Sequence, residues 1–229
     1  MIRDEFLSIA SHELRTPMTT LKLQSQILKK KISKSDDLNA HRVKMELIMN
    51  QIIEQVTSLN RLVEDMLDIA RLRSGNFKIE VAEINLADLI HESVINLAEQ
   101  VTLAGYPPLI IEITGNLKGR WDKMRIGQVI TNILMNAIRY GKQKTIIIKA
   151  EELSVSVKNS IIDQGIGISE EDIERIFEKF ERATSSNQSN GLGLGLFISK
   201  QIINAHKGKI WVESKLNEGS IFCFEIPKN

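Results

Sequence analysis

Two stretches of apolar residues spaced by seven, both within the first 72 residues, constrain the fold of this chain more than any other feature. The first stretch repeats at Leu7, Leu14, Leu21 and Leu28. The second repeats at Met49, Val56, Val63 and Ala70. A seven-residue apolar repeat is typical of helices that pack along a seam. The polar segment Lys34–Asn39 lies between the stretches, so residues 2–72 are predicted to form an antiparallel helical hairpin.

One such hairpin cannot bury both of its apolar seams by itself. Two copies that pack side by side would bury them in a four-helix bundle. The sequence therefore predicts a homodimer that forms through this hairpin.

The heptads end at Ser74-Gly75-Asn76, after which predicted strands and helices follow one another. Strands are expected over residues 77–81, 110–114, 145–150, 153–162, 209–214 and 220–226. Helices are expected over 86–104, 122–140 and 169–180, with a last one ending near Ala205. This order predicts a two-layer α/β sandwich. The fold class is then α+β, with a helical domain over 1–73 and a sandwich domain over 74–229.

Charge and composition exclude several classes of function. The formal net charge is +1, so no chain-wide basic field attracts nucleic acid. No apolar run approaches the roughly 18–20 residues of a membrane span. The single cysteine, Cys223, has no partner for an internal disulfide, which fits a reducing compartment. We expect a cytoplasmic segment, either a whole protein or the cytoplasmic portion of a larger one.

A run of alternating glycines opens the last predicted helix, at Gly191, Gly193 and Gly195. Glycines at such a position let backbone N–H groups approach a phosphate at the positive end of the helix. The spacing is not rare enough to indicate a nucleotide site by itself.

A second glycine-containing motif follows a predicted apolar strand and reads Asp163-Gln164-Gly165-Ile166-Gly167. A carboxylate at the end of a strand can accept a hydrogen bond from the exocyclic amine of adenine. A tight turn with a capping aspartate explains the same residues equally well.

Four polar residues recur along the helix predicted over 122–140. Asn132 and Asn136 share one helix face, and Arg139 lies one turn further on. An amide oxygen is a hard ligand suited to Mg2+, Arg139 could contact phosphates, and Tyr140 could flank a base. An asparagine pair in a helix also has an ordinary structural explanation.

On the first heptad helix, His12 and Thr16 are four residues apart and share one face, and Glu13 is adjacent to His12. Pro17 follows them. Because Leu14 occupies a seam position, His12 is expected to point away from the seam. Glu13 could accept one imidazole proton and make the other ring nitrogen a better nucleophile. A surface histidine beside a glutamate is usually unremarkable, so the neighbouring motifs decide its interpretation.

Taken together, these stretches resemble the sensor histidine kinases of two-component signalling. Residues 6–17, FLSIASHELRTP, match the family's H box almost residue for residue. The N box, the first glycine box, the F box and the second glycine box are similar to residues 132–140, 163–168, 176–182 and 191–196. All five occur in the family's order, and the resemblance covers nearly the whole chain.

The resemblance implies a dimerisation and histidine-phosphotransfer domain followed by a Bergerat-type ATP-binding domain. It assigns His12 as the phosphoacceptor and Glu13 as its general base. Thr16 would orient a water in a phosphatase reaction. The implied ATP-binding residues are Asn132, Asn136, Arg139, Tyr140, Asp163, Gly165, Gly167, Arg182, Gly191, Gly193 and Gly195. Asn136 would bind the metal, so the implied cofactors are ATP and Mg2+.

The implied activity is autophosphorylation on His12, followed by phosphoryl transfer to an aspartate in the receiver domain of a response regulator. One alternative is an ATP-hydrolysing relative such as gyrase. Those proteins carry a water-activating glutamate four residues before the metal-binding asparagine, where this chain has Asn132. The other alternative is a dimeric scaffold that binds nucleotide without catalysis.

Overall fold

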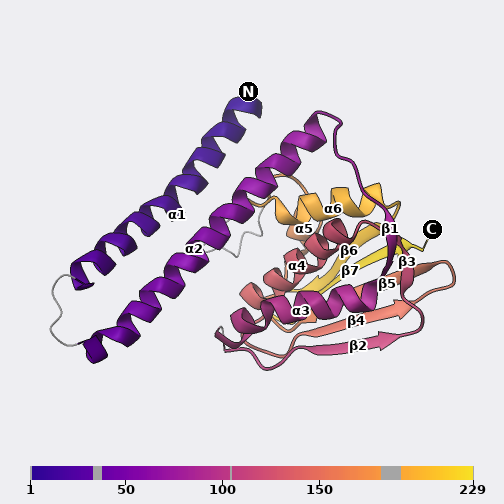
Figure 1. Ribbon diagram of the computed structural model, residues 1–229. Coiled ribbons are helices and arrows are strands. Elements are labelled where there is room, and N and C mark those ends of the chain that lie inside the picture. Colours follow the sequence, from indigo (N-terminus) through magenta and orange to yellow (C-terminus); the bar gives the residue numbers. More distant parts are fainter. Residues whose placement is uncertain (1, 33–37, 104, 182–191, 229) are drawn as a thin grey trace. The chain divides into compact units, whose positions relative to one another are not determined.

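The computed structural model of the chain describes residues 2–32, 38–103, 105–181 and 192–228. The chain divides into two compact units. Helices α1 (Ile2–Ile32) and α2 (Leu38–Arg73) form the first unit, and a sheet with its helices forms the second (Figure 1). No helix within the described ranges is both long enough and apolar enough to cross a membrane.

The first unit is the antiparallel hairpin that the heptads predict (Figure 1). Leu14 and Leu21 of α1 are half-buried, and Gln24 Nε2 donates to Gln51 Oε1 of α2 at 3.2 Å. Pro17 lies inside α1 with its side chain buried. Its missing N–H removes the donor that the Glu13 carbonyl would otherwise accept from, so the helix is locally weakened just after His12.

The second unit is built from short strands and helices in mixed order. Its helices are α3 (Leu86–Leu103), α4 (Lys123–Tyr140), α5 (Glu170–Ile173) and α6 (Gly195–Ala205). Its strands are β1 (Ala82–Asn85), β2 (Ile110–Thr114), β3 (Lys118–Trp121), β4 (Ile147–Glu152), β5 (Ser156–Asp163), β6 (Lys209–Lys215) and β7 (Gly219–Pro227).

The main sheet has the strand order β2-β4-β5-β7-β6. β2 and β4 are parallel, since the chain crosses over between them through β3 and α4, and the other neighbours are antiparallel. Helices α3, α4 and α6 lie over one face of this sheet (Figure 1). The two-layer sandwich predicted from the sequence is confirmed.

The core lies between the sheet and these helices. Ile126, Ile130 and Ile133 of α4 are fully buried, as are Ile202 of α6 and Phe224 of β7. Burying side chains of this kind contributes about 1.5–3 kcal/mol each before the entropic cost of ordering them. The sheet therefore fixes α4 through the apolar face of the helix.

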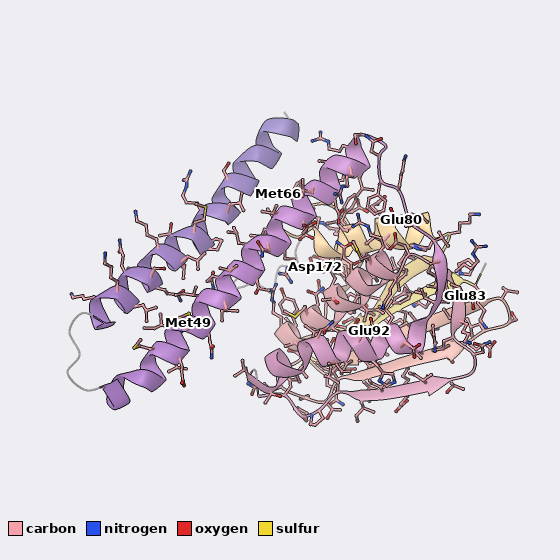
Figure 2. All side chains as sticks on the ribbon, in the orientation of Figure 1. Met49, Met66, Glu80, Glu83, Glu92 and Asp172 are labelled. Carbon is pink, nitrogen blue, oxygen red and sulfur yellow. The ribbon has the colours of Figure 1, made fainter. Side chains whose placement is uncertain are left out.

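A polar contact joins α3 to α4 at the surface. Glu92 of α3, labelled in Figure 2, pairs with Lys123 at the start of α4, with 2.9 Å between Oε1 and Nζ. Both side chains are more than half exposed, so this ion pair adds little to stability.

The expected strand over 77–81 is wrong, because the strand in this region is β1, over Ala82–Asn85. β1 pairs with β3, a strand that the sequence did not suggest. Trp121, at the end of β3, explains the pairing, because its ring is buried and its Nε1 donates to the Pro227 carbonyl at 2.6 Å. The two residues are 106 positions apart in the sequence, so no local pattern indicates their contact.

The helix expected over 169–180 is also wrong in its length, since α5 covers only Glu170–Ile173. Ser169 caps it as expected, with Oγ accepting from the Asp172 N–H. Turns replace the helix afterwards, and Phe180 has a φ of +64°, a backbone conformation that a helix cannot include.

Cys223 lies buried in β7, next to Ser160 of β5, with 3.3 Å between Sγ and Oγ. Burial raises the pKa of the Cys223 thiol, although the contact with Ser160 partly opposes this. The thiol is therefore poorly suited to nucleophilic chemistry.

The start of α4 and the end of α6 are joined by the buried ring of His206. The Asp122 N–H donates to Nε2 at 3.0 Å, and Nδ1 lies 2.8 Å from the Ile202 carbonyl. A carbonyl only accepts, so the ring proton is on Nδ1 and Nε2 is the acceptor. The carboxylate of Asp122 caps α4 at Arg125 N and also accepts the Glu80 N–H. His206 is a structural histidine in this arrangement.

We predict that His206→Ala lowers the free energy of unfolding by about 1–3 kcal/mol, because it removes the buried acceptor of the Asp122 N–H. The matched control is His91→Ala, since His91 is exposed on α3 and should change stability by less than about 0.5 kcal/mol. Urea denaturation followed by tryptophan fluorescence tests this, because Trp121 and Trp211 both lie in the second unit. Equal effects of the two substitutions would contradict the structural role.

Candidate functional site

The carboxyl group of Asp163 ends β5 in a buried position, with 6% of the residue exposed. Its Oδ1 accepts the Gly165 N–H at 2.8 Å, and the Ser220 N–H donates to the same carboxyl group. Burial raises the pKa of Asp163, while these two backbone hydrogen bonds act in the opposite direction. A carboxylate has about four lone-pair sites, so Asp163 can still accept a hydrogen bond from a bound base.

The turn after Asp163 packs so closely that it requires glycine at two positions. A Cβ on Gly165 would lie 2.0 Å from the Tyr140 carbonyl oxygen. A Cβ on Gly167 would lie equally close to the Lys215 carbonyl oxygen, and its φ is +66°. The Ile166 N–H also donates to the Tyr140 carbonyl at 3.1 Å. The fold thus brings Asp163, Gly165 and the end of α4 together.

The polar residues of α4 differ in their surroundings. Asn132 is 9% exposed, and its Nδ2 donates to the Gly195 carbonyl at 3.2 Å and to Ser199 Oγ at 3.4 Å. Asn136, one turn later, is half-buried, and its side chain forms no hydrogen bond with the residues that the structure describes. Arg139 is exposed, and Tyr140 is half-buried.

Two glycines of the alternating run lie within the described residues. Gly193 has a φ of +66°, and a Cβ there would lie 2.7 Å from the Glu181 carbonyl oxygen. Gly195 begins α6 and lies against Asn132. The segment before the run is tied to α6 by an ion pair between Lys200 and Glu178, 3.0 Å long. Gly191 and Arg182 are outside the described residues.

The residues predicted for phosphoryl chemistry form a separate group on α1, in the first unit. The side chains of His12 and Glu13 are outside the described part of the structure. Thr16 is exposed, one turn beyond His12. The described residues that the sequence predicts for nucleotide binding all lie in the second unit, and their roles, like those of His12, Glu13 and Thr16, stay predictions.

The geometry of the second unit fits a nucleotide with its metal. The half-buried amide of Asn136 offers a neutral oxygen of the kind that Mg2+ binds beside phosphates and water. α6 begins at Gly195 without a capping side chain from Leu194, so the positive end of its helix dipole lies there. The sequence did not single out Ser199 or Lys200. The only feature of the sequence that could have indicated these two residues is their spacing, four and five residues after Gly195.

Comparison with known families agrees with this geometry. Residues 2–75 match the His Kinase A (phospho-acceptor) domain. Residues 121–229 match the family described as histidine kinase-, DNA gyrase B-, and HSP90-like ATPase.

Curated relatives match along almost the whole chain. The sensor histidine kinase GacS of Pseudomonas protegens is 31% identical over 240 residues, which cover 98% of this chain and 24% of GacS. The adaptive-response sensory kinase SasA of Crocosphaera subtropica is 32% identical, with 98% of this chain and 59% of SasA covered. The chain therefore spans between about a quarter and three-fifths of the length of these relatives.

Solved structures show the same fold. The histidine kinase AdeS of Acinetobacter baumannii superimposes with a TM-score of 0.69 at 27% identity, covering 95% of this chain and 98% of that one. The histidine kinase ThkA, solved in complex with the response regulator TrrA, gives a TM-score of 0.66 at 29% identity. That match covers 98% of this chain and 61% of ThkA.

We predict that Asp163→Asn weakens ATP binding about ten- to a hundredfold, because a charged acceptor is replaced by a neutral amide. The free energy of unfolding of the Asp163→Asn variant should not fall below that of the wild type. Because the folded pKa of Asp163 is raised, ionising this group opposes folding as the pH rises through that pKa, and asparagine removes this opposition.

Calorimetric ATP titration and urea denaturation at neutral pH measure the two effects. Asp172→Asn is the matched control, because Asp172 is equally buried but accepts from the Ser169 hydroxyl at 2.9 Å. That variant should lose about 1 kcal/mol of stability and keep its ATP affinity. Unchanged ATP affinity in Asp163→Asn would remove Asp163 from the nucleotide site.

Proposed function

The chain belongs to the sensor histidine kinases, and from this premise we propose that it phosphorylates its own His12 with ATP. The phosphoryl group would then pass to an aspartate of a response regulator. The observation that carries the ATP-binding part of this proposal is the buried carboxylate of Asp163, held beside the end of α4 by the close packing of Gly165. We also propose residues 1–73 as the phosphotransfer domain and residues 74–229 as the ATP-binding domain.

In the proposed reaction, one imidazole nitrogen of His12 forms a bond to the γ-phosphorus of ATP. The bond from that phosphorus to the bridging oxygen breaks, and ADP leaves. Glu13 takes the proton from the other ring nitrogen, which keeps the imidazole nucleophilic as it reacts. Pro17 supports this assignment, because the weakened helix just after His12 allows local adjustment.

The second unit would bind and orient the nucleotide. Asp163 would accept the adenine amine, and Tyr140 would flank the base. Asn136 would hold Mg2+, while Arg139 and Arg182 would contact phosphates beside Gly191, Gly193 and Gly195. Bound Mg2+ would supply neutralising charge to the phosphates.

Hydrolysis of ATP by an activated water is the competing reaction. It needs a general base at the position of Asn132, and an amide is not a base. Moreover, the Nδ2 of Asn132 is already hydrogen-bonded to Gly195 and Ser199. The absence of a base at residue 132 argues against hydrolysis as the main reaction.

The hairpin is proposed to form a homodimer. Several large apolar side chains of α1 and α2 are 40% exposed or more: Met18, Leu23, Ile27, Leu47, Met49, Ile53, Val56, Val63 and Leu67. Met49, labelled on α2 in Figure 2, repeats at Val56 and Val63, and all three have 42–48% of their surface exposed. A second hairpin would cover this seam.

The partner after phosphorylation would be the receiver domain of a response regulator. ThkA, a structural neighbour, was solved with the response regulator TrrA. We propose a similar partner here, in the cytoplasm, and no nucleic-acid ligand.

We predict that His12→Ala abolishes self-phosphorylation and leaves ATP affinity unchanged, because the residue lies in the first unit and the nucleotide residues in the second. Incubation with labelled ATP should give acid-labile, base-stable phosphate on the wild-type chain only. Calorimetric titration checks that the variant still binds ATP. Labelling that persists without His12 would refute the phosphoacceptor assignment, and ATP turnover without any labelling would favour hydrolysis. Nucleotide binding with neither would favour the scaffold.

We also predict that Thr16→Ala removes phosphatase activity toward a phosphorylated response regulator but keeps autophosphorylation within a few-fold. Thr16 is an exposed residue. We propose that its hydroxyl orients a water, since a hydroxyl is too weak an acid or base to activate imidazole. The control is Thr19→Ala, because Thr19 is an exposed threonine of the same helix whose Oγ1 donates to the Arg15 carbonyl at 2.8 Å. Equal losses of both activities in Thr16→Ala would indicate a structural role.

A further inference from the structure

Three polar groups form a closed hydrogen-bonded triangle between α4 and α6. Ser199 Oγ donates to the Gly195 carbonyl at 2.8 Å, one helical turn earlier. Asn132 Nδ2 donates to the same carbonyl at 3.2 Å and to Ser199 Oγ at 3.4 Å. Ser199 is completely buried, and Asn132 nearly so.

The triangle determines which way the Asn132 amide faces. The Gly195 carbonyl can only accept, so the amide must present its nitrogen there rather than its oxygen. The Ser199 hydroxyl donates its one hydrogen to the Gly195 carbonyl, so it can only accept from Asn132. The Asn132 group that faces Ser199 must therefore also be the amide nitrogen. The Oδ1 of Asn132 accepts no hydrogen bond from the residues that the structure describes.

The orientation of this oxygen concerns the proposed Mg2+ site. Asn132 lies one turn before Asn136 on the same face of α4, so the two amides are neighbours. An amide oxygen turned away from α6 can accept a hydrogen bond from a water of the metal's hydration shell, which Mg2+ commonly retains. The opposite rotamer would present N–H groups, which repel both the cation and its water hydrogens.

We propose that Ser199 is a positioning residue for the Mg–nucleotide site, acting through Asn132. Its hydroxyl keeps the amide oxygen of Asn132 directed toward the metal side and fixes the first turn of α6 to α4. This inference rests on the proposed function, since it presupposes that Mg-ATP binds beside Asn136.

The competing explanation is that Ser199 is an ordinary buried serine that bonds to its own helix. The chain contains such a serine for comparison. Ser93 of α3 is 5% exposed, and its Oγ donates to the Leu89 carbonyl at 2.8 Å, also one turn earlier. Ser93→Ala therefore removes the same type of hydrogen bond without disturbing Asn132.

The test compares Ser199→Ala with Ser93→Ala in calorimetric titrations of the full chain with ATP, once with Mg2+ and once with a chelator. We expect Ser199→Ala to weaken Mg-ATP binding about three- to tenfold, the range of one hydrogen bond. Binding of metal-free ATP should change less than twofold. Ser93→Ala should change neither affinity. Urea denaturation should nevertheless give a similar loss of stability for Ser93→Ala and Ser199→Ala.

A third variant, Ser199→Thr, separates positioning from packing. Threonine keeps the hydroxyl but adds a methyl group at a completely buried position, so stability should fall while Mg-ATP affinity recovers. Equal weakening with and without Mg2+, or affinity that follows stability across the variants, would overturn the inference. A wild-type chain that binds no ATP would instead refute the proposed function, and this inference with it.

Discussion

The position of helix α4 is the constraint on which the rest of the second unit depends. Its buried isoleucines fix it to the sheet, but apolar packing alone permits sliding and rotation. Polar contacts at both ends prevent this. The N-terminal end is held by the capping carboxylate of Asp122 and the ring of His206, and the Tyr140 carbonyl accepts the Ile166 N–H at the other end. The residues of α4 that are proposed to bind the nucleotide therefore occupy fixed places beside the turn after β5.

The sequence predicted those parts of the fold that depend on local patterns. Seven-residue spacing identified the hairpin, and Asp163 was correctly placed at the end of a buried strand, because glycines mark the turn that follows it. The β1–β3 pair was missed, because Trp121 anchors it through a hydrogen bond to Pro227, 106 residues away. The length of α5 was overestimated, since the apolar residues that follow it are buried in turns rather than in a helix.

The residues of the candidate site also fall into two groups, those that local sequence patterns indicate and those that only contacts in the fold reveal. Residue type and spacing were enough to propose Asp163, Asn136 and the glycines as site residues, because their predicted roles need a carboxylate, an amide oxygen and the absence of a side chain. Ser199 could not be indicated, because a serine within an apolar helix has no distinctive spacing, and its importance arises only from the contact with Asn132 across two helices. The same contact fixes the amide nitrogen of Asn132, a predicted ATP-binding residue, against α6.

The buried Cys223 has a practical consequence for studying the motions of this protein. It is the only cysteine in the chain, and its thiol is enclosed between β5 and β7 with a raised pKa. A maleimide or spin label applied to the folded protein would react with it slowly. A cysteine introduced at an exposed position of α1 or α6 would then carry nearly all of the label. Distances between chosen pairs of sites could be followed through a catalytic cycle on an otherwise native background.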